Sequence, residues 1–135
     1  MLQAGEVIAF VGSADLQRAR VFYEQTLGLR VIEDNEFACV FDANGTMLRV
    51  TAVAEVARAG YTVLGWRVAG IAAVVRGLAA RGVVFLRYDG MDQDEGGVWT
   101  TPAGDQVAWF ADPDGNVLSL TQFAASGDAG VWRGA

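Results

Sequence analysis

The chain has 135 residues, a length that suits one domain with a buried core and is short for two. Its 53% hydrophobic residues against 19% charged ones exclude an intrinsically disordered chain. The net charge is −6, and the 10 basic side chains are all arginines scattered singly, so nucleic acid is excluded as a favourable partner. Apolar segments end well before the roughly 20 residues of a membrane span. The N-terminus also lacks a secretory signal pattern, so we expect a cytoplasmic protein with no membrane partner.

The chain has a single cysteine, Cys39, and no histidine. One cysteine excludes an internal disulfide, and the absence of histidine removes the usual base partner of a catalytic thiol. Cys39 lies between Ala38 and Val40 in an apolar run. We therefore expect it to be a buried core residue.

The first half of the chain is predicted to contain one helix among four strands. Asp15 stands at a helix N-cap position, apolar residues follow at helical spacing up to Leu27, and Gly28 closes the helix. Asp34-Asn35 and the segment 42–45 have the composition of hairpin turns. The strands are predicted at Glu6–Val11, Val31–Glu33, Glu36–Phe41 and Thr46–Val53. The order over about residues 5–53 is therefore β-α-β-β-β.

The same order recurs after a linker of about residues 54–60. A strand at Tyr61–Val68 is followed by helical spacing from Ile71 that ends at Gly82. Further strands are predicted at Val83–Arg87, Trp99-Thr100, Val107–Ala111 and Asn116–Phe123, with an acidic loop at 89–97. This second unit covers about residues 61–123. It leaves a tail, residues 124–135, that we expect either to be disordered or to dock on a neighbour.

The two halves also match residue by residue. Residues 41–51 align without gaps on residues 111–121, including an Asn-Gly turn in the first and an Asp-Gly turn in the second. Self-similarity of this kind indicates a duplicated unit. We predict a single α+β domain of two tandem βαβββ modules, whose strands form a curved, half-open sheet or barrel around a central pocket with the helices outside.

Asp112, Asp114 and Asn116 superficially suggest a calcium-binding loop. That motif requires glycine at its sixth position and glutamate at its twelfth, whereas here Gly115 is fourth and Phe123 is twelfth. Asp, Asn and Gly all tolerate the backbone angles of a tight turn. We therefore interpret the segment as a turn between two strands.

Alternation along the strands divides their side chains between two faces. One face is uniformly apolar and is predicted to form the core beneath the helices: Val7, Ala9, Val11, Leu48, Val50, Leu64, Trp66, Val68, Leu118 and Leu120. The other mixes apolar and polar groups: Glu6, Ile8, Phe10, Met47, Arg49, Thr51, Tyr61, Val63, Gly65, Val117, Ser119 and Thr121. A mixed lining suits a concave small-molecule site, although a dimer contact or solvent exposure also accounts for it.

Arg49 is the informative member of the second face. An unpaired buried charge costs several kcal/mol, so a guanidinium on an inward face needs an acceptor. Arg49 is expected either to pair internally, with Glu6 or less readily with Glu33 or Glu36, or to await an anionic ligand.

Motifs spread over nearly the whole chain resemble those of a known family. They are Ser13–Leu16, Phe22–Glu24, Leu27–Leu29, Leu78–Val83 and Trp109–Asn116. In order and spacing they are similar to the vicinal oxygen chelate superfamily, which includes glyoxalase I, extradiol dioxygenases, fosfomycin-resistance transferases and bleomycin-resistance proteins. The resemblance implies the same duplicated fold around a ligand pocket.

The resemblance also implies where a metal would be held. In metal-dependent members, a histidine or glutamate stands at one position in each of four strands, and these positions correspond to Ile8, Arg49, Val63 and Ser119 here. None is a good ligand for a divalent ion, and Arg49 would repel one. The resemblance therefore points to the branch exemplified by bleomycin resistance, whose members bind a small molecule without metal or other cofactor, commonly as homodimers.

We accordingly expect a metal-free binding protein for a small molecule, such as an antibiotic or metabolite, with no catalytic residue. The predicted ligand-binding residues are Ile8, Phe10, Met47, Arg49, Tyr61, Val63, Trp99 and Ser119, with Trp99 either a lid or a plug at the pocket mouth. One alternative is a glyoxalase- or dioxygenase-type enzyme with metal ligands at Glu6, Glu33, Glu36 or Glu55. Others are metal-free acid/base catalysis through Tyr61 and a buried carboxylate, and a purely structural role.

Overall fold

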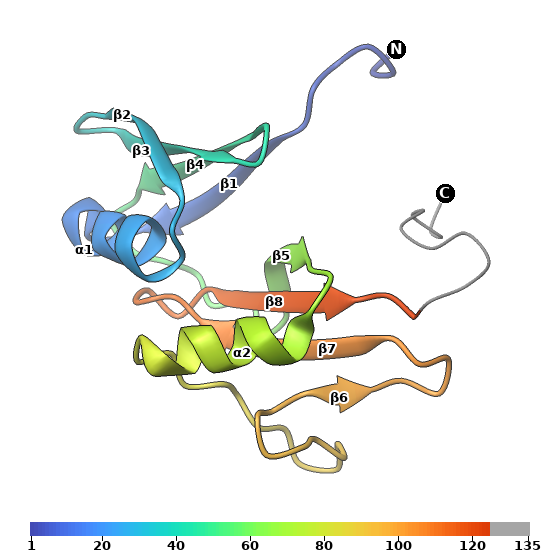
Figure 1. Cartoon of the computed structure of the whole chain (residues 1–135). Helices are drawn as coiled ribbons and strands as arrows, with labels where there is room; N and C mark the ends of the chain where they lie inside the picture. Colours follow the sequence, from blue (N-terminus) through green and yellow to red (C-terminus); the bar gives the residue numbers. More distant parts are fainter. Residues whose placement is uncertain (125–135) are drawn as a thin grey trace.

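The computed structural model describes residues 1–124 and contains two four-stranded sheets with helical segments packed against them (Figure 1). The first unit comprises β1 (Ile8–Ser13), α1 (Leu16–Arg20), its π-helical continuation η1 (Val21–Thr26), β2 (Arg30–Asp34), β3 (Ala38–Ala43) and β4 (Thr46–Ala52). The second comprises β5 (Thr62–Arg67), α2 (Ile71–Ala80), β6 (Trp99–Thr100), β7 (Gln106–Ala111) and β8 (Val117–Gln122). The predicted α+β fold of two βαβββ modules is confirmed. The predicted tail lies outside the described residues, apart from Ala124.

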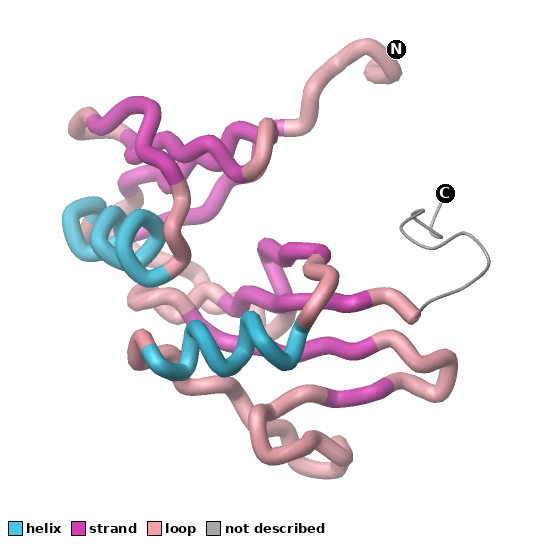
Figure 2. The backbone as a smooth tube through the Cα atoms, in the orientation of Figure 1, coloured by secondary structure: helices cyan, strands magenta, loops and turns pink. Residues whose placement is uncertain are grey.

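The two sheets have the same topology, as expected of a duplicated unit. Their strand orders are β1-β4-β3-β2 and β5-β8-β7-β6, and both sheets are open. In each unit the first strand pairs in parallel with the last, while the remaining pairs are antiparallel. Figure 2 shows the strands of the two units as separate groups, one above the other. The edge strands β1 and β5 approach each other where the units meet.

Local sequence signals explain where most elements begin and end. The Asp15 carboxylate caps α1 by accepting a hydrogen bond from the Arg18 backbone N–H at 3.1 Å. Gly28 ends the first helical segment with a φ of +79°, a left-handed conformation that glycine adopts without a Cβ clash. The β3–β4 turn likewise uses positive φ at Asn44 (52°) and Gly45 (93°).

Three local predictions were wrong. The helix predicted up to Leu27 is α-helical only to Arg20 and then widens into η1, where the Leu27 N–H donates to the Phe22 carbonyl. Val7 is 78% exposed because it precedes β1 and so takes no part in the sheet. The segment 83–87 does not form the predicted strand. It meets β7 through a backbone hydrogen bond from the Leu86 N–H to the Trp109 carbonyl, which does not by itself make a strand ladder.

A single apolar core joins both units. The predicted core residues Val11, Leu48, Val50, Leu118 and Leu120 are buried, and Ala9, Leu64, Trp66 and Val68 pack against them half-buried. Two aromatic contacts connect η1 to both sheets: Tyr23 lies 5.7 Å from Phe41 on β3, and Phe22 lies 6.4 Å from Phe110 on β7, between ring centroids. The first helical segment is therefore shared between the two sheets.

The turn between β7 and β8 is bound to the first unit through a buried carboxylate. Asp112 Oδ2 accepts hydrogen bonds from the Tyr23 hydroxyl at 2.7 Å and from Asn116 Nδ2 at 2.8 Å. Its Oδ1 accepts from the backbone N–H groups of Asp114 and Asn116, each at 2.9 Å. Asn116 Nδ2 also donates to the Gly12 carbonyl at 2.8 Å. Because both Asp112 oxygens are satisfied, this carboxylate can be buried without an uncompensated desolvation penalty.

Asp114 makes a second set of contacts at the same junction. Its Oδ1 accepts from the Ala14 backbone N–H at 2.9 Å and from Arg18 Nη2 at 3.0 Å, both at the start of the first helical segment. Gly115 then lies against the linker, since a Cβ added there would come 2.9 Å from Arg58 Nε. Asp112 and Asp114 thus accept N–H and O–H donors of the protein, although the second Asp114 oxygen, Oδ2, is buried without a hydrogen-bond partner among residues 1–124.

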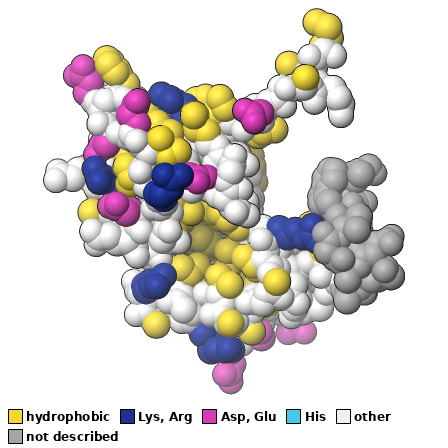
Figure 3. All heavy atoms as spheres, turned by 45° about the horizontal axis from the view of Figure 1, so that its top comes forward, with side chains coloured by type: hydrophobic (Ala, Val, Ile, Leu, Met, Phe, Trp, Pro, Cys, Tyr) yellow, Lys and Arg dark blue, Asp and Glu magenta, His cyan; other side chains and the backbone are white. Residues whose placement is uncertain are grey.

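Hydrophobic side chains also gather in a hollow between the two halves of the molecule (Figure 3). An apolar cavity of about 130 Å³ lies between the end of the first helical segment and the second sheet; its lining residues are Leu27, Leu29, Trp66, Val68, Val74, Leu78, Phe110 and Leu120. Within residues 1–124, no helix has the length and apolarity that a membrane span requires.

Replacing Tyr23 by phenylalanine tests the junction. Burial and the adjacent Asp112 carboxylate raise the pKa of Tyr23, so its hydroxyl remains a donor at all ordinary pH values. The variant leaves Asp112 short of one donor, and we expect a loss of about 1–3 kcal/mol in the free energy of unfolding, measured by urea denaturation. Tyr61→Phe, at a side chain that is 69% exposed, is the control and should change stability by less than about 0.5 kcal/mol. Equal effects of the two variants would contradict the role of the junction.

Candidate functional site

The outward face of the first sheet, turned away from the core, is apolar and open. Ile8 stands beside Met47 and Phe10 beside Arg49 in the parallel pairing of β1 with β4. Ile8, Phe10 and Met47 are 45%, 59% and 38% exposed. Large apolar side chains exposed together in this way mark a surface that binds a ligand or a partner. Four of the predicted site residues are thus brought together.

Arg49 has no ionic partner on this face. The ion pairs among residues 1–124 involve Arg18, Arg20 and Arg30, and no hydrogen bond from Arg49 to another described residue is present. The internal pairing with Glu6, Glu33 or Glu36 that the sequence left open is therefore not formed in the described part of the chain. Its guanidinium is half-buried beside Phe10 and available to an anion.

A pocket of about 410 Å³ lies at one end of this face. Its lining residues are Glu6, Val7, Ile8, Ile32, Asp42, Gly45 and Met47. The Gly45 backbone N–H and the Arg30 guanidinium both donate to Asp42 and hold the pKa of that carboxyl below its usual range. Asp42 is therefore an acceptor occupied by the β3–β4 turn, which leaves Glu6 as the open acidic group of this pocket.

The outward face of the second sheet carries a recessed hydroxyl. Ser119 is 7% exposed, and its Oγ has no hydrogen-bond partner among residues 1–124. It points at Gly65 on the neighbouring strand β5, where an added Cβ would lie only 2.8 Å from Ser119 Oγ. The absence of a side chain at Gly65 thus makes the room that the hydroxyl occupies.

Aromatic rings adjoin this hydroxyl. Trp109 on β7 stands directly opposite Ser119 on β8, and Trp99 on β6 stacks with Trp109 at 6.3 Å and an interplanar angle of 28°. Tyr88 meets Trp109 edge-on at 5.3 Å. Trp99 belongs to a strand and so is part of a platform of three aromatic rings, which we call the aromatic platform (Tyr88, Trp99, Trp109).

Sequence reasoning missed two residues of the second face. Trp109 and Arg67 lie there, and the Arg67 guanidinium is 5.5 Å from the centre of the Phe123 ring, with no carboxylate paired to it in the described part of the chain. Strand alternation contained the signal, because Arg67 has the parity of Val63 and Trp109 pairs directly with Ser119.

The remaining predicted residues, Val63 and Tyr61, adjoin the second face. Val63 is 40% exposed at an irregularity of β5, and Tyr61 precedes that strand at 69% exposure. The Tyr61 hydroxyl has no hydrogen-bond partner among residues 1–124. The buried-carboxylate partner that acid/base catalysis through Tyr61 requires is therefore absent from the described contacts.

The acidic loop is anchored to the rest of the second unit. The Arg87 guanidinium donates to the backbone carbonyls of Asp94 and Glu95. Gln93 Nε2 donates to the carbonyls of Leu86 and Gly97 at 2.9 and 2.8 Å, while its Oε1 accepts from the Tyr88 N–H at 2.8 Å. These bonds hold Tyr88, and with it one edge of the aromatic platform, in a fixed position.

The donor chemistry at the four positions assigned to metal ligands does not fit a divalent cation. Ile8 and Val63 offer no donor atom, Arg49 is positively charged, and Ser119 supplies only a neutral hydroxyl. No group of three or more His, Cys, Asp or Glu side chains within residues 1–124 is placed to hold a metal ion. The glutamates considered as substitutes, Glu6, Glu33, Glu36 and Glu55, are all exposed.

Comparison with known proteins supports this fold. The sequence model of the "Glyoxalase/Bleomycin resistance protein/Dioxygenase superfamily" matches residues 7–120. No protein of curated function matches the sequence. Among solved structures, a member of that superfamily from Sphaerobacter thermophilus has 24% identity and a TM-score of 0.71, covering 90% of this chain and 99% of its own.

Two further structures are similar over nearly the whole chain. A glyoxalase family protein from Enterococcus faecalis has 20% identity and a TM-score of 0.69, with coverage of 90% of this chain and 99% of its own. A lactoylglutathione lyase from Agrobacterium tumefaciens has 14% identity and a TM-score of 0.68, with coverage of 87% and 93%. At these identities the likeness shows the shared fold.

Cys39 should be chemically inert in the folded protein. Its side chain is fully buried on β3, and burial, helped by the nearby Asp34 charge, raises the pKa of the thiol to about 11. Only about one thiol in a thousand is then ionised at pH 8. We expect iodoacetamide, followed by mass spectrometry, to alkylate native protein at least about a hundredfold more slowly than urea-unfolded protein. Comparable rates in the two states would contradict this and reopen Cys39 as a nucleophile.

Proposed function

Because the chain belongs to the glyoxalase/bleomycin resistance protein/dioxygenase superfamily, we propose that it binds a small planar anion, such as an aromatic carboxylate, without a metal. The observation that carries the proposal is the guanidinium of Arg49, which lies without a carboxylate partner on an apolar face. The resemblance places Arg49 where the metal-dependent members of the family have a residue that binds the metal. An arginine there favours a carboxylate or phenolate and repels a cation.

The charge of the ligand follows from the local arginines. Arg49 on the first sheet and Arg67 on the second both face outward and have no carboxylate within ion-pair distance among the described residues. The net charge of −6 acts over a longer range and is screened by salt, so it affects the rate of encounter more than the orientation of a bound ligand. An anion is therefore favoured once the ligand is in place.

The proposal assigns the rest of the ligand to the aromatic platform and Ser119, on the outward face of the second sheet. Planar rings stack on tryptophan with little loss of side-chain entropy. Ser119 Oγ can either donate to or accept from a polar substituent of the ring. The expected ligand therefore combines a flat aromatic ring, an anionic group and one further polar atom.

A homodimer forms part of the proposal. Ile8, Phe10 and Met47 remain between 38% and 59% exposed in the single chain, which is a large apolar surface to leave in water. A second copy of the chain that covers this surface would exclude water from Arg49 and strengthen its interaction with an anion. The ligand site would then be completed by both subunits.

Titration calorimetry with naphthoate tests the proposal. We expect saturable binding to the wild-type protein, and binding at least about tenfold weaker, or about 1.4 kcal/mol, for Arg49→Gln. Arg76→Gln removes an exposed positive charge from α2, outside every pocket residue named here, and is the matched control, with an unchanged dissociation constant. Naphthamide, the neutral isostere, should bind wild type and Arg49→Gln about equally.

Equal naphthoate binding by wild type and Arg49→Gln would contradict the assignment of the anion to Arg49. Metal analysis of the purified protein tests the alternative of a glyoxalase- or dioxygenase-type enzyme with unusual ligands. Stoichiometric zinc, nickel, manganese or iron would overturn the metal-free proposal and direct attention to the glutamates.

Gly65→Ala probes the Ser119 recess. The new Cβ would lie 2.8 Å from Ser119 Oγ, so the hydroxyl must move and the recess is filled. In the Gly65→Ala variant, we expect the affinity for hydroxynaphthoate, whose hydroxyl is proposed to contact Ser119, to fall more than the affinity for naphthoate. Gly77→Ala, in α2 with nothing within 4 Å of the new Cβ, is the control and should stabilise the protein by about 0.5–1 kcal/mol without changing either affinity. If Gly65→Ala affects both ligands equally, Ser119 does not contact the ligand.

A further inference from the structure

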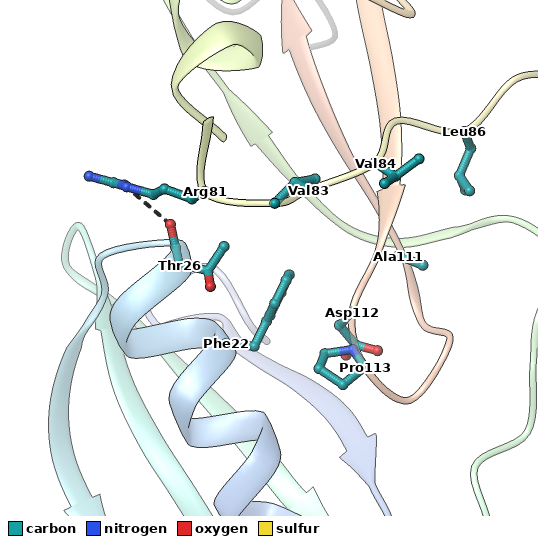
Figure 4. A pocket seen from close by; sticks show the side chains of 10 residues that line it. Phe22, Thr26, Arg81, Val83, Val84, Leu86, Ala111, Asp112 and Pro113 are labelled. Atoms are coloured by element: carbon teal, nitrogen blue, oxygen red, sulfur yellow. Dashed lines mark hydrogen bonds between the residues drawn. The ribbon is translucent and has the colours of Figure 1, made fainter. Parts of the chain in front are cut away.

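A second pocket lies on the helical side of the fold, where the two units meet. Its volume is about 440 Å³, within the range of small-molecule sites. The extended segment that follows α2 forms one side, η1 forms the other, and the end of β7 closes it (Figure 4). Neither the outward faces nor the aromatic platform contributes to this pocket. The site proposed above leaves it without a role.

Polar and apolar groups both line the pocket. Phe22 projects from η1 into the space between the helix and the extended segment, and Pro113 lies near it (Figure 4). Val84 on the opposite side is 81% exposed although its neighbour Phe85 is buried. Val84 therefore offers an exposed apolar side chain at the rim of the pocket.

Arg81 stands at one end of the pocket, and its side chain extends outward past Thr26 (Figure 4). Arg81, just beyond α2, donates from Nη1 to the Thr26 carbonyl at 3.2 Å and has no carboxylate partner among the described residues. This single bond to a neutral acceptor leaves most of the guanidinium N–H groups free. The Thr26 hydroxyl, beside it, has no hydrogen-bond partner in residues 1–124.

Asp112, the only acidic residue among those that line this pocket, does not oppose an anion there. It is 5% exposed, and both of its oxygens are engaged by Tyr23, Asn116 and the backbone of the turn. It therefore presents no free acceptor to the pocket and cannot make it a cation site. The lining thus combines an available cation with an apolar trough.

We propose that this pocket binds an amphipathic monoanion with a short aliphatic chain, its carboxylate on Arg81 and Thr26 and its chain between Phe22, Val84 and Pro113. The carboxyl ends of η1 and α2 lie near the head group and carry partial negative charge. The full charge of Arg81 is therefore what makes an anion acceptable at this end. Without it, the pocket should lose its preference for a carboxylate over an alcohol of equal chain length.

Octanoate and octanol are suitable probes, measured by titration calorimetry and by amide shifts in ¹⁵N-correlated NMR spectra. For wild type we expect saturable binding of one octanoate per chain, weaker binding of octanol, and shifts at Thr26 and Val84. Arg81→Gln should weaken octanoate binding at least about fivefold, while leaving octanol binding unchanged. Arg76→Gln, an exposed arginine of the same helix outside the pocket, should behave as wild type.

Val84→Asn should weaken octanoate and octanol alike, because it removes only the apolar wall. In Arg49→Gln, octanoate should still shift the amide signals of Thr26 and Val84, which separates this pocket from the site on the outward face. The inference is overturned if these shifts do not saturate, if they are equal in Arg81→Gln and wild type, or if they are lost in Arg49→Gln.

Discussion

The Asp112 carboxylate lies at the point where the second unit is joined to the first, and its hydrogen bonds hold the two units together there. Its two oxygens take up four donors, from the Tyr23 hydroxyl, the Asn116 side chain and two backbone N–H groups of the turn. Asn116 then reaches the Gly12 carbonyl in β1. One turn therefore fixes the first helical segment, the end of β1 and the β7–β8 hairpin relative to each other. The helical-side pocket and both outward faces contain elements that this turn contacts or connects.

The distribution of positive charge separates the two sides of the fold. A chain with a net charge of −6 nevertheless places three guanidinium groups, each without an ion pair among residues 1–124, beside apolar side chains: Arg49 and Arg67 on the outward faces, and Arg81 on the helical side. Within the same residues, Arg18, Arg20 and Arg30 form ion pairs at the junction and on the exposed surface. Cations beside apolar walls favour amphipathic anions. Under the proposed function, a guanidinium would stand where metal-dependent relatives have a Lewis acid; it would bind an anion but could not polarise a carbonyl as a metal does.

Much of the fold could be predicted from sequence because its signals are local. Elements begin or end at residues with their own backbone preferences, such as Asp15, Gly28 and the Asn44-Gly45 turn. Because the chain is a duplication, the elements predicted in one half also indicate those of the other. Strand parity identified the core residues and placed Ile8, Phe10, Met47 and Arg49 together. Features that depend on contacts between distant segments were not predicted from sequence. The widening of the first helix into η1, the bond between Tyr23 and Asp112 and the pocket around Arg81 all depend on segments far apart in the chain. Trp109 and Arg67 were within reach of sequence reasoning, because both lie on predicted strands and strand alternation places them on the outward face.

The central claim is that the anionic group of a ligand rests on Arg49 where relatives hold a metal. Crystals of the protein soaked with para-bromobenzoate test it most directly, because anomalous scattering from bromine locates the ring while the carboxylate is read from the density. We expect the carboxylate to pair with the Arg49 guanidinium and the bromine to lie among the outward-facing apolar or aromatic side chains. A metal ion at the outward face, with carboxylates converging on it and Arg49 turned away, would rule out metal-free binding at Arg49.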